Sequence, residues 1–259
     1  MMKDYLSFSS LKSFTECEAE AVAVMAREWD RRATFSKATL EAMLAGQYVH
    51  KYFESLESFE QFKAENGAEM LTKTGSLKAQ FQIADKMVKV LDKDPLFKAI
   101  YHGSKEVEIW GEISGIKFKG FIDCLNLEKD IFIDIKTLAK SIRDKEWSDK
   151  EHRKLLWIEA RKYHWQMAIY QELLRQHTDE HISKEVLPIV YVVTKEPFPD
   201  SAGIQIPQFM LDEALEEVKE ATERYKEVLD GRQPERCESC NYCKATKRNT
   251  RTILVTDLM

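Results

Sequence analysis

The stretch from Glu106 to Lys136 constrains the fold more than any other part of the sequence. It contains three runs rich in β-branched and aromatic residues, separated by Ser114-Gly115 and by the polar segment Asn126 to Asp130. Such runs with turn signals between them are typical of consecutive β-strands. We therefore predict a three-stranded meander, with strands at 106–113, 116–125 and 131–136.

The chain before this meander has helical periodicity. Apolar residues recur at helical spacing over residues 7–30, where Ser9 or Ser10 can cap the first turn. A second helical stretch runs from about Ser36 to Glu65. A third follows the turn signal Thr74-Gly75-Ser76 and closes before Asp94-Pro95, because proline discourages continuation of a helix.

The chain after the meander returns to helix and strand. We predict a long helix from about His152 to Gln176, a buried strand from Val186 to Thr194, and a helix from Leu211 to Leu229 that Gly231 caps. No repeat or low-complexity tract interrupts this order. The pattern favours one α/β domain over residues 1–259, divided into a mainly helical part (1–103), a core (104–230) and a cysteine-bearing tail (231–259).

The composition is that of an ordinary globular protein, with 44% hydrophobic and 32% charged residues. No apolar run is long enough to span a bilayer, and residues 1–12 lack the pattern of a secretory signal, so we expect a cytoplasmic protein with no membrane partner. The net charge of −5 argues against a general polyanion-coating protein. It does not exclude a nuclease, which needs only a local basic surface.

The second and third predicted strands carry the residues with the clearest chemical pattern. If their turn is centred between Glu128 and Lys129, Asp123 lies opposite Asp134, with Cβ atoms about 5 Å apart. Lys136 is two residues beyond Asp134 and shares its face of the sheet. The opposite face, toward a core, is then formed by Ile122, Cys124, Ile133 and Ile135. A register shift of one residue would separate these groups.

Two carboxylates and an ammonium on one sheet face have two readings. Paired carboxylates repel each other and are tolerated where a hard divalent cation lies between them. Such an ion can polarise a phosphoryl oxygen and activate a water, and a lysine can position that water or stabilise developing charge. The alternative is a solvated strand face, on which an aspartate and a lysine at alternate positions are ordinary.

Several segments in the expected order resemble the RecB-type branch of the P-D-(D/E)-x-K nucleases, and most closely the phage and prophage RecE-like exonucleases. The metal-binding histidine of that family is matched in the segment GQYVH, and its strand aspartate in a G-x-x-D motif is matched in GFID. The motif D-x-K and a following Q-x-x-x-Y are also present. The matching positions are His50, Asp123, Asp134, Lys136, Gln166 and Tyr170. Aspartate in place of the commoner glutamate before x-K is a permitted variant.

The resemblance implies a restriction-endonuclease-like core, a mixed β-sheet flanked by helices, with a helical N-terminal region. It implies hydrolysis of DNA with one or two Mg²⁺ or Mn²⁺ ions. In this scheme Lys136 assists the attacking water, while Gln166 and Tyr170 shape the site. The implied metal ligands are His50, Asp123, Asp134 and the backbone carbonyl of Ile135.

The spacing of Gln166 and Tyr170 is also compatible with a purely structural role. At i,i+4 on a helix both side chains can reach the same neighbour. Equally, Tyr170 could pack in the core while Gln166 lies on the surface. A lone histidine such as His50 on an amphipathic helix is commonly a partly buried polar group.

The resemblance further implies a biological setting. A RecE-like enzyme acts as an exonuclease on duplex ends in phage-type DNA recombination, in a bacterial or phage-infected host. A single-strand annealing recombination protein is then a partner, and the chain forms a homo-oligomeric ring around DNA. Two alternatives stay open: a single-strand or structure-specific nuclease of a repair or CRISPR-adaptation pathway, and a non-catalytic DNA-binding scaffold.

The five cysteines point to metal chemistry rather than to disulfides. Their odd number argues against a disulfide framework, and Cys237, Cys240 and Cys243 have C-x2-C-x2-C spacing. Cys17 could supply a fourth ligand from the other end of the chain. The residues alone permit tetrahedral zinc, an iron–sulfur cluster or four unligated thiols. Cys124 is predicted to be a buried core thiol.

A second resemblance favours iron at this site. The segment S-x-S-x-L-x-x-F-x-x-C before Cys17 is similar to that of AddB-type nucleases and CRISPR adaptation nucleases. Those proteins bind a [4Fe–4S] cluster through one N-terminal and three C-terminal cysteines. In those proteins more than two residues separate the last cysteine from the one before it, whereas two residues separate Cys240 from Cys243 here. The resemblance therefore implies a [4Fe–4S] cluster that ties the first helix to the tail.

Basic residues are frequent from Lys136 to Lys162, but acidic residues are interspersed among them. Trp147 and Trp157 could stack on bases, although packing within the protein is the favoured interpretation. The sequence predicts no individual DNA contact.

Overall fold

A mixed five-stranded sheet forms the centre of the computed structural model, which describes residues 5–148, 151–176, 186–248, 252, 254 and 255. The strand order is β1-β2-β3-β6-β7, and all neighbours are antiparallel except the parallel pair β3 and β6. This arrangement confirms the predicted mixed sheet. The strand bounds are β1 Ser104–Ile113, β2 Ile116–Asn126, β3 Ile131–Leu138, β6 Leu187–Thr194 and β7 Ser201–Gln205.

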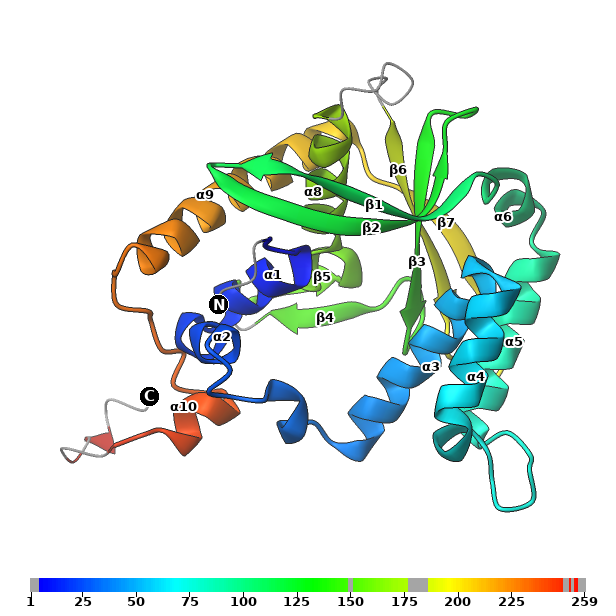
Figure 1. Cartoon of the computed structure of the whole chain (residues 1–259), viewed down its shortest axis with the longest axis horizontal. Coiled ribbons are helices and arrows are strands. Elements are labelled where there is room, and N and C mark those ends of the chain that lie inside the picture. The colour runs from blue at the N-terminus through cyan, green and yellow to red at the C-terminus, as the bar shows by residue number, and fades with distance from the viewer. Residues whose placement is uncertain (1–4, 149–150, 177–185, 249–251, 253, 256–259) are drawn as a thin grey trace.

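Helices precede, separate and follow these strands (Figure 1). The N-terminal ones are α1 Phe8–Glu16, α2 Glu18–Met25, the 3-10 helix η1 Arg31–Thr34, α3 Lys37–Glu54, α4 Leu56–Met70, α5 Ala79–Lys93 and α6 Pro95–Ile100. A small hairpin and the remaining helices are β4 Lys145–Ser148, β5 Arg153–Leu156, α7 Trp157–Ala160, α8 Tyr163–Arg175, α9 Gln208–Leu229 and α10 Asn241–Ala245.

The sheet is covered on both faces, and each face has its own core. Helices α1, α8 and α9 bury one face around Phe118, Phe132 and Met167. Helices α3 to α6 bury the other face around Phe81 and Met87 (Figure 1). Full burial of one such side chain contributes about 1.5–3 kcal/mol, so both cores hold the central strands firmly.

The predicted register of the β2–β3 hairpin is confirmed. Cys124 pairs with Ile133, and the next pairs follow the same centre between Glu128 and Lys129. The paired ladder begins at Cys124 and Ile133, so Asp123 and Asp134 lie just beyond it. The two strands therefore separate at the position of the two carboxylates.

The predicted facing of Ile122 was wrong. Ile122 lies in the core beneath α8, whereas Cys124 lies in the core beneath α3 to α6. The reason is an irregularity at Asp123: its neighbours on β2 pair with β1, but Asp123 does not pair with Glu106. Glu106 has a φ of +48°, outside the extended region, so the regular pairing of the two strands is interrupted at this point.

The first two predicted helical stretches are each broken once. Ser7, rather than Ser9 or Ser10, caps α1. Cys17 has extended backbone angles (φ −161°, ψ 105°), and its sulfur caps α2 by accepting the N–H of Glu20. Ser55 likewise ends α3 and caps α4. In both cases a side chain that can cap a helix starts a second helix. The apolar periodicity continues across both breaks, so it predicted one helix where there are two.

The single helix predicted from His152 to Gln176 was also wrong. Residues 153–156 instead form β5, which pairs with β4, and Lys162 interrupts the rest with a φ of +55°. The pairing partner lies earlier in the chain, so local periodicity could not reveal it. Strand β7, a short edge strand containing Gly203, was not predicted. The strand and helix expected at 186–194 and 211–229 are present as β6 and α9, and Gly231 follows α9 with a φ of +106°.

In the part of the chain that the structure describes, every helix is too short or too polar to cross a membrane.

Candidate active site

Strand β3 presents Asp134 and Lys136 to helix α8. The Lys136 Nζ atom lies 2.5 Å from Asp134 Oδ2. The side-chain amide of Gln166 in α8 donates a 2.8 Å hydrogen bond to Asp134 Oδ1. Asp134 is only 2% exposed. The structure therefore brings together the D-x-K motif and the first residue of Q-x-x-x-Y.

Asp123 joins strand β3 to helix α3. Its Oδ2 atom accepts the backbone N–H of Ile135 at 2.6 Å and lies 3.2 Å from His50 Nδ1. The hydroxyl of Tyr101 donates to the Asp123 carbonyl at 3.4 Å. His50 and Asp123 are thus adjacent, and the Ile135 amide beside them is committed to the carboxylate.

The two carboxylates have opposite pKa shifts. Burial raises the pKa of Asp134, and the nearby Asp123 adds to this, against the attraction of Lys136. Burial also acts on Asp123, but His50 and Lys136 outweigh it and hold the pKa of Asp123 below its usual value. Burial opposes the charged forms of His50 and Lys136, yet Asp123 raises the pKa of His50 and Asp134 raises that of Lys136.

Tyr170 lies behind this group, against strand β2. A Cβ atom on Gly120 would overlap the Tyr170 ring, so the glycine of the G-x-x-D motif makes room for that ring. Burial raises the pKa of Tyr170 to about 12, so its hydroxyl remains protonated at neutral pH. Gln166 interacts with the same hydroxyl.

The donor set fits a hard divalent cation. Asp134 Oδ2 is buried, with the Lys136 ammonium 2.5 Å away as its partner. Carboxylate oxygens suit Mg²⁺ and Mn²⁺, and an imidazole also suits Mn²⁺. His50, Asp123 and Asp134 are nevertheless not gathered as tightly as the cysteines described below. Instead, His50 is paired with Asp123, and Asp134 is paired with Lys136.

Glu106 is a candidate site residue that the sequence did not reveal. It lies across from Asp123 on β1 with its φ of +48°, a backbone conformation unusual for glutamate. Burial and then the charge of Asp123 raise the pKa of its carboxyl group, and His50 acts on it as well. Strain of this kind is concentrated at functional sites. No motif marks Glu106, because its nearness to Asp123 depends on strand pairing.

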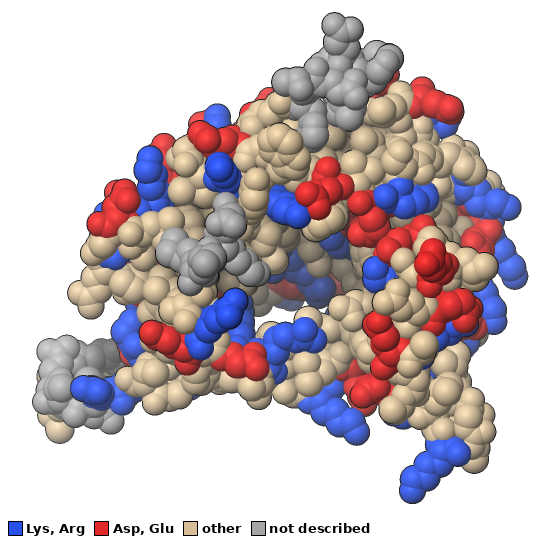
Figure 2. Space-filling model, in the orientation of Figure 1, with Lys and Arg blue, Asp and Glu red and all other residues tan. Residues whose placement is uncertain are grey.

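A group of cations from distant segments lies close together. Burial lowers the pKa of Lys12, and repulsion from Arg161 and Arg31 lowers it further. Burial and Arg161 act on Lys195 in the same way. Figure 2 shows lysine and arginine side chains around the hollow in the middle of this face. We call Lys12, Arg31, Arg161 and Lys195 the basic group.

A cavity of about 400 Å³ lies beside the end of β3, between it and the β4–β5 hairpin. Lys140, Lys145, Trp147 and Arg161 are among the residues that line it. Trp157, which also lines it, is buried and donates to the Ile142 carbonyl at 2.9 Å, as expected of a packed residue. Trp147 is 59% exposed, which differs from the packing favoured by the sequence. The cavity thus offers an aromatic face and several cations, with Asp144 and Glu146 beside them.

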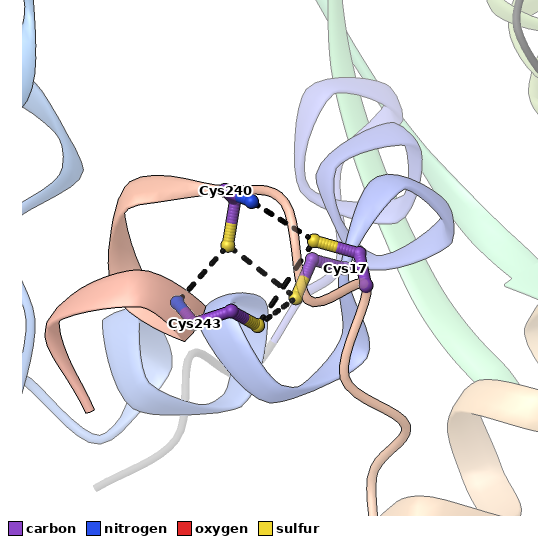
Figure 3. A group of neighbouring side chains, drawn as sticks. Cys17, Cys240 and Cys243 are labelled. Carbon is purple, nitrogen blue, oxygen red and sulfur yellow. Dashed lines mark hydrogen bonds between the residues drawn. The ribbon is translucent and has the colours of Figure 1, made fainter. Parts of the chain in front are cut away.

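The four cysteines outside the sheet form a second group. Cys17 lies between α1 and α2, and Cys237, Cys240 and Cys243 lie in and before α10 (Figure 3). Among the described residues they form the only set of three or more histidine, cysteine or acidic residues whose ligand atoms all lie within 4.8 Å of one another. Cys124 is elsewhere, fully buried in the core as predicted, with Lys105 Nζ 3.1 Å from its sulfur.

The fold and this buried carboxylate–lysine arrangement are those of a nuclease of the PD-(D/E)xK superfamily. Residues 7–246 match the family described as "PDDEXK-like domain of unknown function (DUF3799)", and the chain belongs to that family.

A crystal structure described as a "Putative exonuclease" from Eubacterium rectale is 31% identical, with a TM-score of 0.85 over 99% of this chain and 93% of that one. A second, the crystal structure of SSO0001, is 18% identical with a TM-score of 0.34 over 82% of this chain and 86% of that one, a score too low to indicate a shared fold. No curated protein matches the chain.

Proposed function

We propose that this nuclease is a metal-dependent deoxyribonuclease that degrades linear duplex DNA from its ends. The observation that carries the proposal is the state of Asp134. Gln166 donates to one of its oxygens, and the other lies 2.5 Å from the Lys136 ammonium in a site that is almost closed to solvent. Burial and the nearby Asp123 both raise the pKa of Asp134, so they oppose its charged form, and a bound cation would offset both effects. Such an arrangement suits a carboxylate that binds a cation.

We assign Asp123, Asp134, His50 and the backbone carbonyl of Ile135 as ligands of one or two Mg²⁺ or Mn²⁺ ions. When bound, such an ion supplies a Lewis acid for a phosphoryl oxygen and lowers the pKa of a bound water. Asp123 is already oriented for this role by the Ile135 N–H and by His50.

The other residues of the site orient the metal ligands and the attacking water, and they offset negative charge. Lys136 keeps its ammonium at Asp134 and 4.7 Å from the centre of the Tyr163 ring, where it can position the attacking water and offset negative charge developing on the phosphate. Gln166 holds Asp134 in one orientation. Tyr170 fills the space between α8 and Gly120 and keeps Gln166 in place.

DNA as the substrate is supported by the distribution of charge. The chain carries a net charge of −5, yet the basic group gathers on the side of the sheet where β3 and β6 end. Within the protein, Arg31 pairs with Glu16 and Arg161 with Glu146, and the phosphates of a polyanion could take the place of these acidic partners. The exposed Trp147 ring in the neighbouring cavity could stack on an unpaired base.

The exonuclease mode rests on the RecE-like resemblance and on the similarity to the Eubacterium rectale structure. The same resemblance supports a role in phage-type recombination with a single-strand annealing protein, and a ring-shaped homo-oligomer. A single-strand or structure-specific nuclease would use the same residues. The exposed Trp147 favours that second candidate, because stacking requires an unpaired base.

The test is a digestion assay with end-labelled linear duplex, linear single-stranded and closed circular DNA, each with Mg²⁺, Mn²⁺ or EDTA. The proposal expects loss of the linear duplex from its ends, an intact closed circle, and no reaction in EDTA. Cleavage of the circle would replace exonuclease by endonuclease action. Digestion of single strands alone would support the second candidate, and no cleavage of any substrate would leave a DNA-binding scaffold.

Asp134→Ala is expected to abolish metal-dependent cleavage and leave the protein folded, as judged by circular dichroism. Asp134→Asn provides a second variant of nearly equal size, because removal of the whole side chain leaves Lys136 unpaired in the interior. Unchanged activity in a folded Asp134 variant would contradict the assignment of this site.

A further inference from the structure

The cysteine group is built from the two ends of the described chain. Cys17 is placed by the break between α1 and α2, where its extended backbone turns the sulfur out of the helical path. Cys237, Cys240 and Cys243 come from the segment that leads into and through α10. All four are free thiols, and Cys17 and Cys243 are buried. Four sulfurs in such a position constitute a complete set of metal ligands.

The geometry points to one tetrahedral metal ion of the zinc type at Cys17, Cys237, Cys240 and Cys243, in place of the [4Fe–4S] cluster that the resemblance implies. The sulfur–sulfur distances carry this inference. They are 3.6 Å between Cys17 and Cys243 and 3.7 Å between Cys17 and Cys240. The distance between Cys237 and Cys243 is 4.0 Å.

These distances match a single ion at the centre of the four sulfurs. Zinc–thiolate bonds are about 2.3 Å long, and a regular tetrahedron of that radius has edges of about 3.8 Å. The three distances lie on both sides of this value, and all four sulfurs lie within 4.8 Å of one another. The group therefore has the size of a mononuclear site.

A four-iron cluster would need a wider group. In that cluster each cysteine binds a different iron, and the irons and inorganic sulfides occupy the space between the cysteines. The four cysteine sulfurs must then lie well beyond the edge length of a mononuclear tetrahedron. The approach of Cys17 to both Cys240 and Cys243 leaves no room for the cluster (Figure 3).

The backbone around the sulfurs is arranged for thiolates. The N–H of Glu20 donates to Cys17 at 3.5 Å, that of Cys240 to Cys237 at 3.3 Å, and that of Cys243 to Cys240 at 3.3 Å. In each case the donor lies three residues after the accepting sulfur. Such N–H groups partly neutralise the charge that thiolate ligands bring to the metal. Arg236 lies nearby and donates to the Cys243 carbonyl at 2.8 Å.

The metal would stabilise the contact between α10 and α2, where few apolar side chains are buried. The buried apolar group here consists of Cys17, Ala19 and Cys243 alone. Beyond it, the edge contact of Trp29 with Tyr242 joins α10 to the rest of the molecule, while Arg236 bonds within the tail itself, to the Cys243 carbonyl and to Thr246. A structural zinc site contributes folding free energy directly. The ion would thus fasten residues 236–247 to α2.

The test is the metal content of the whole protein, purified without oxygen from cells supplied with both iron and zinc. The expected result is about one zinc per chain, with neither iron nor acid-labile sulfide and no visible colour. Replacement by Co²⁺ should give the intense visible absorption of a tetrahedral cobalt–thiolate site. About four irons with inorganic sulfide, or no bound metal at all, would overturn the inference.

Two serine variants make the test specific. Cys240→Ser removes one ligand, while a serine can still cap α10 as the Cys240 sulfur does. Cys124→Ser is the matched control, because Cys124 is buried in the distant core. Zinc should be lost from the first variant and kept by the second, and equal zinc in both would contradict the inference.

Limited trypsin digestion adds a structural measurement on the unmodified chain. A zinc chelator should speed cleavage after Arg236 and Lys244 several-fold, and added zinc should reverse the effect. If Cys240→Ser fails to fold, the zinc content and the chelator response of the unmodified protein still test the inference. A cleavage rate that the chelator does not change would contradict a metal that fastens the tail.

Discussion

The side-chain amide of Gln166 donates a hydrogen bond to Asp134 across the boundary between helix α8 and strand β3. Both groups are almost fully buried, and the bond fixes the orientation of the carboxylate relative to Lys136. A helix residue thus controls the geometry of a strand residue that lies 32 positions earlier in the chain.

Gln166→Ala should lower kcat/KM by about 10- to 100-fold, as loss of a group that orients a metal ligand commonly does. Higher Mg²⁺ should restore part of the activity, because the loss lies in metal affinity. Gln171→Ala in the same helix is the control, since Gln171 is equally buried but bonds to the Val186 carbonyl and to Gln208. A comparable loss in both variants would mean that α8 matters only as a scaffold.

Gly120→Ala should lower both stability and activity, because the added methyl group meets the Tyr170 ring. Overpacking of this kind costs about 1–3 kcal/mol. Gly67→Ala is the control, since a Cβ at Gly67 contacts nothing within 4 Å. Urea denaturation and the digestion assay measure the two effects. A fully active, fully stable Gly120→Ala variant would show that the ring can move freely.

Glu106→Gly should separate stability from activity. Glycine accepts the φ of +48° without strain, so the free energy of unfolding should rise by up to about 1 kcal/mol. Loss of the carboxylate beside Asp123 should at the same time weaken the binding of Mg²⁺ and lower the rate of cleavage. Ser114→Gly has the same φ of +48° in the β1–β2 turn and should gain stability with unchanged activity. Equal activity in both glycine variants would remove Glu106 from the site.

Asp94 should make the fold sensitive to acid. Burial opposes its charge, but hydrogen bonds from Tyr191, Ser201 and the first turn of α6 outweigh burial and hold the pKa of Asp94 below its usual value. A lowered folded pKa contributes stability above the unfolded pKa of about 4, and this contribution is lost as the pH falls through the folded value.

Asp94→Asn keeps a good N-cap for α6 but removes the charge. Its stability should therefore be less dependent on pH below about 4 than that of the unmodified protein. Asp94→Ala should lose about 1 kcal/mol more through the missing cap. Urea denaturation across this pH range measures both. An identical acid dependence in the Asn variant would show that another group causes it.

The sequence predicted best where local pattern and topology coincide. The β2–β3 register followed from one turn, because the pairing of a hairpin is fixed once its centre is known. The parallel neighbour of β3 and the β4–β5 hairpin depend on pairing between distant segments, which periodicity does not encode. Cys17 was predicted to be a ligand, but its interruption of the helix was not predicted.

The same distinction applies to the candidate site. His50, Asp123, Asp134, Lys136 and Gln166 could be chosen because each belongs to a motif of fixed spacing. Glu106 belongs to none, and its position beside Asp123 arises from an irregular strand pair. The basic group likewise draws its members from α1, η1, the turn before α8 and the end of β6. Only the folded chain brings such residues together.

Cys17 lies more than two hundred positions from Cys240 and Cys243, its neighbours in space. During translation its thiol therefore leaves the ribosome long before its partners exist. The sheet, made in between, can fold domain-wise while the first two helices still lack their final contact. Residues 237–243 thus reach the first two helices only after the sheet has been made, and until then Cys17, at the junction of those helices, lacks its sulfur neighbours.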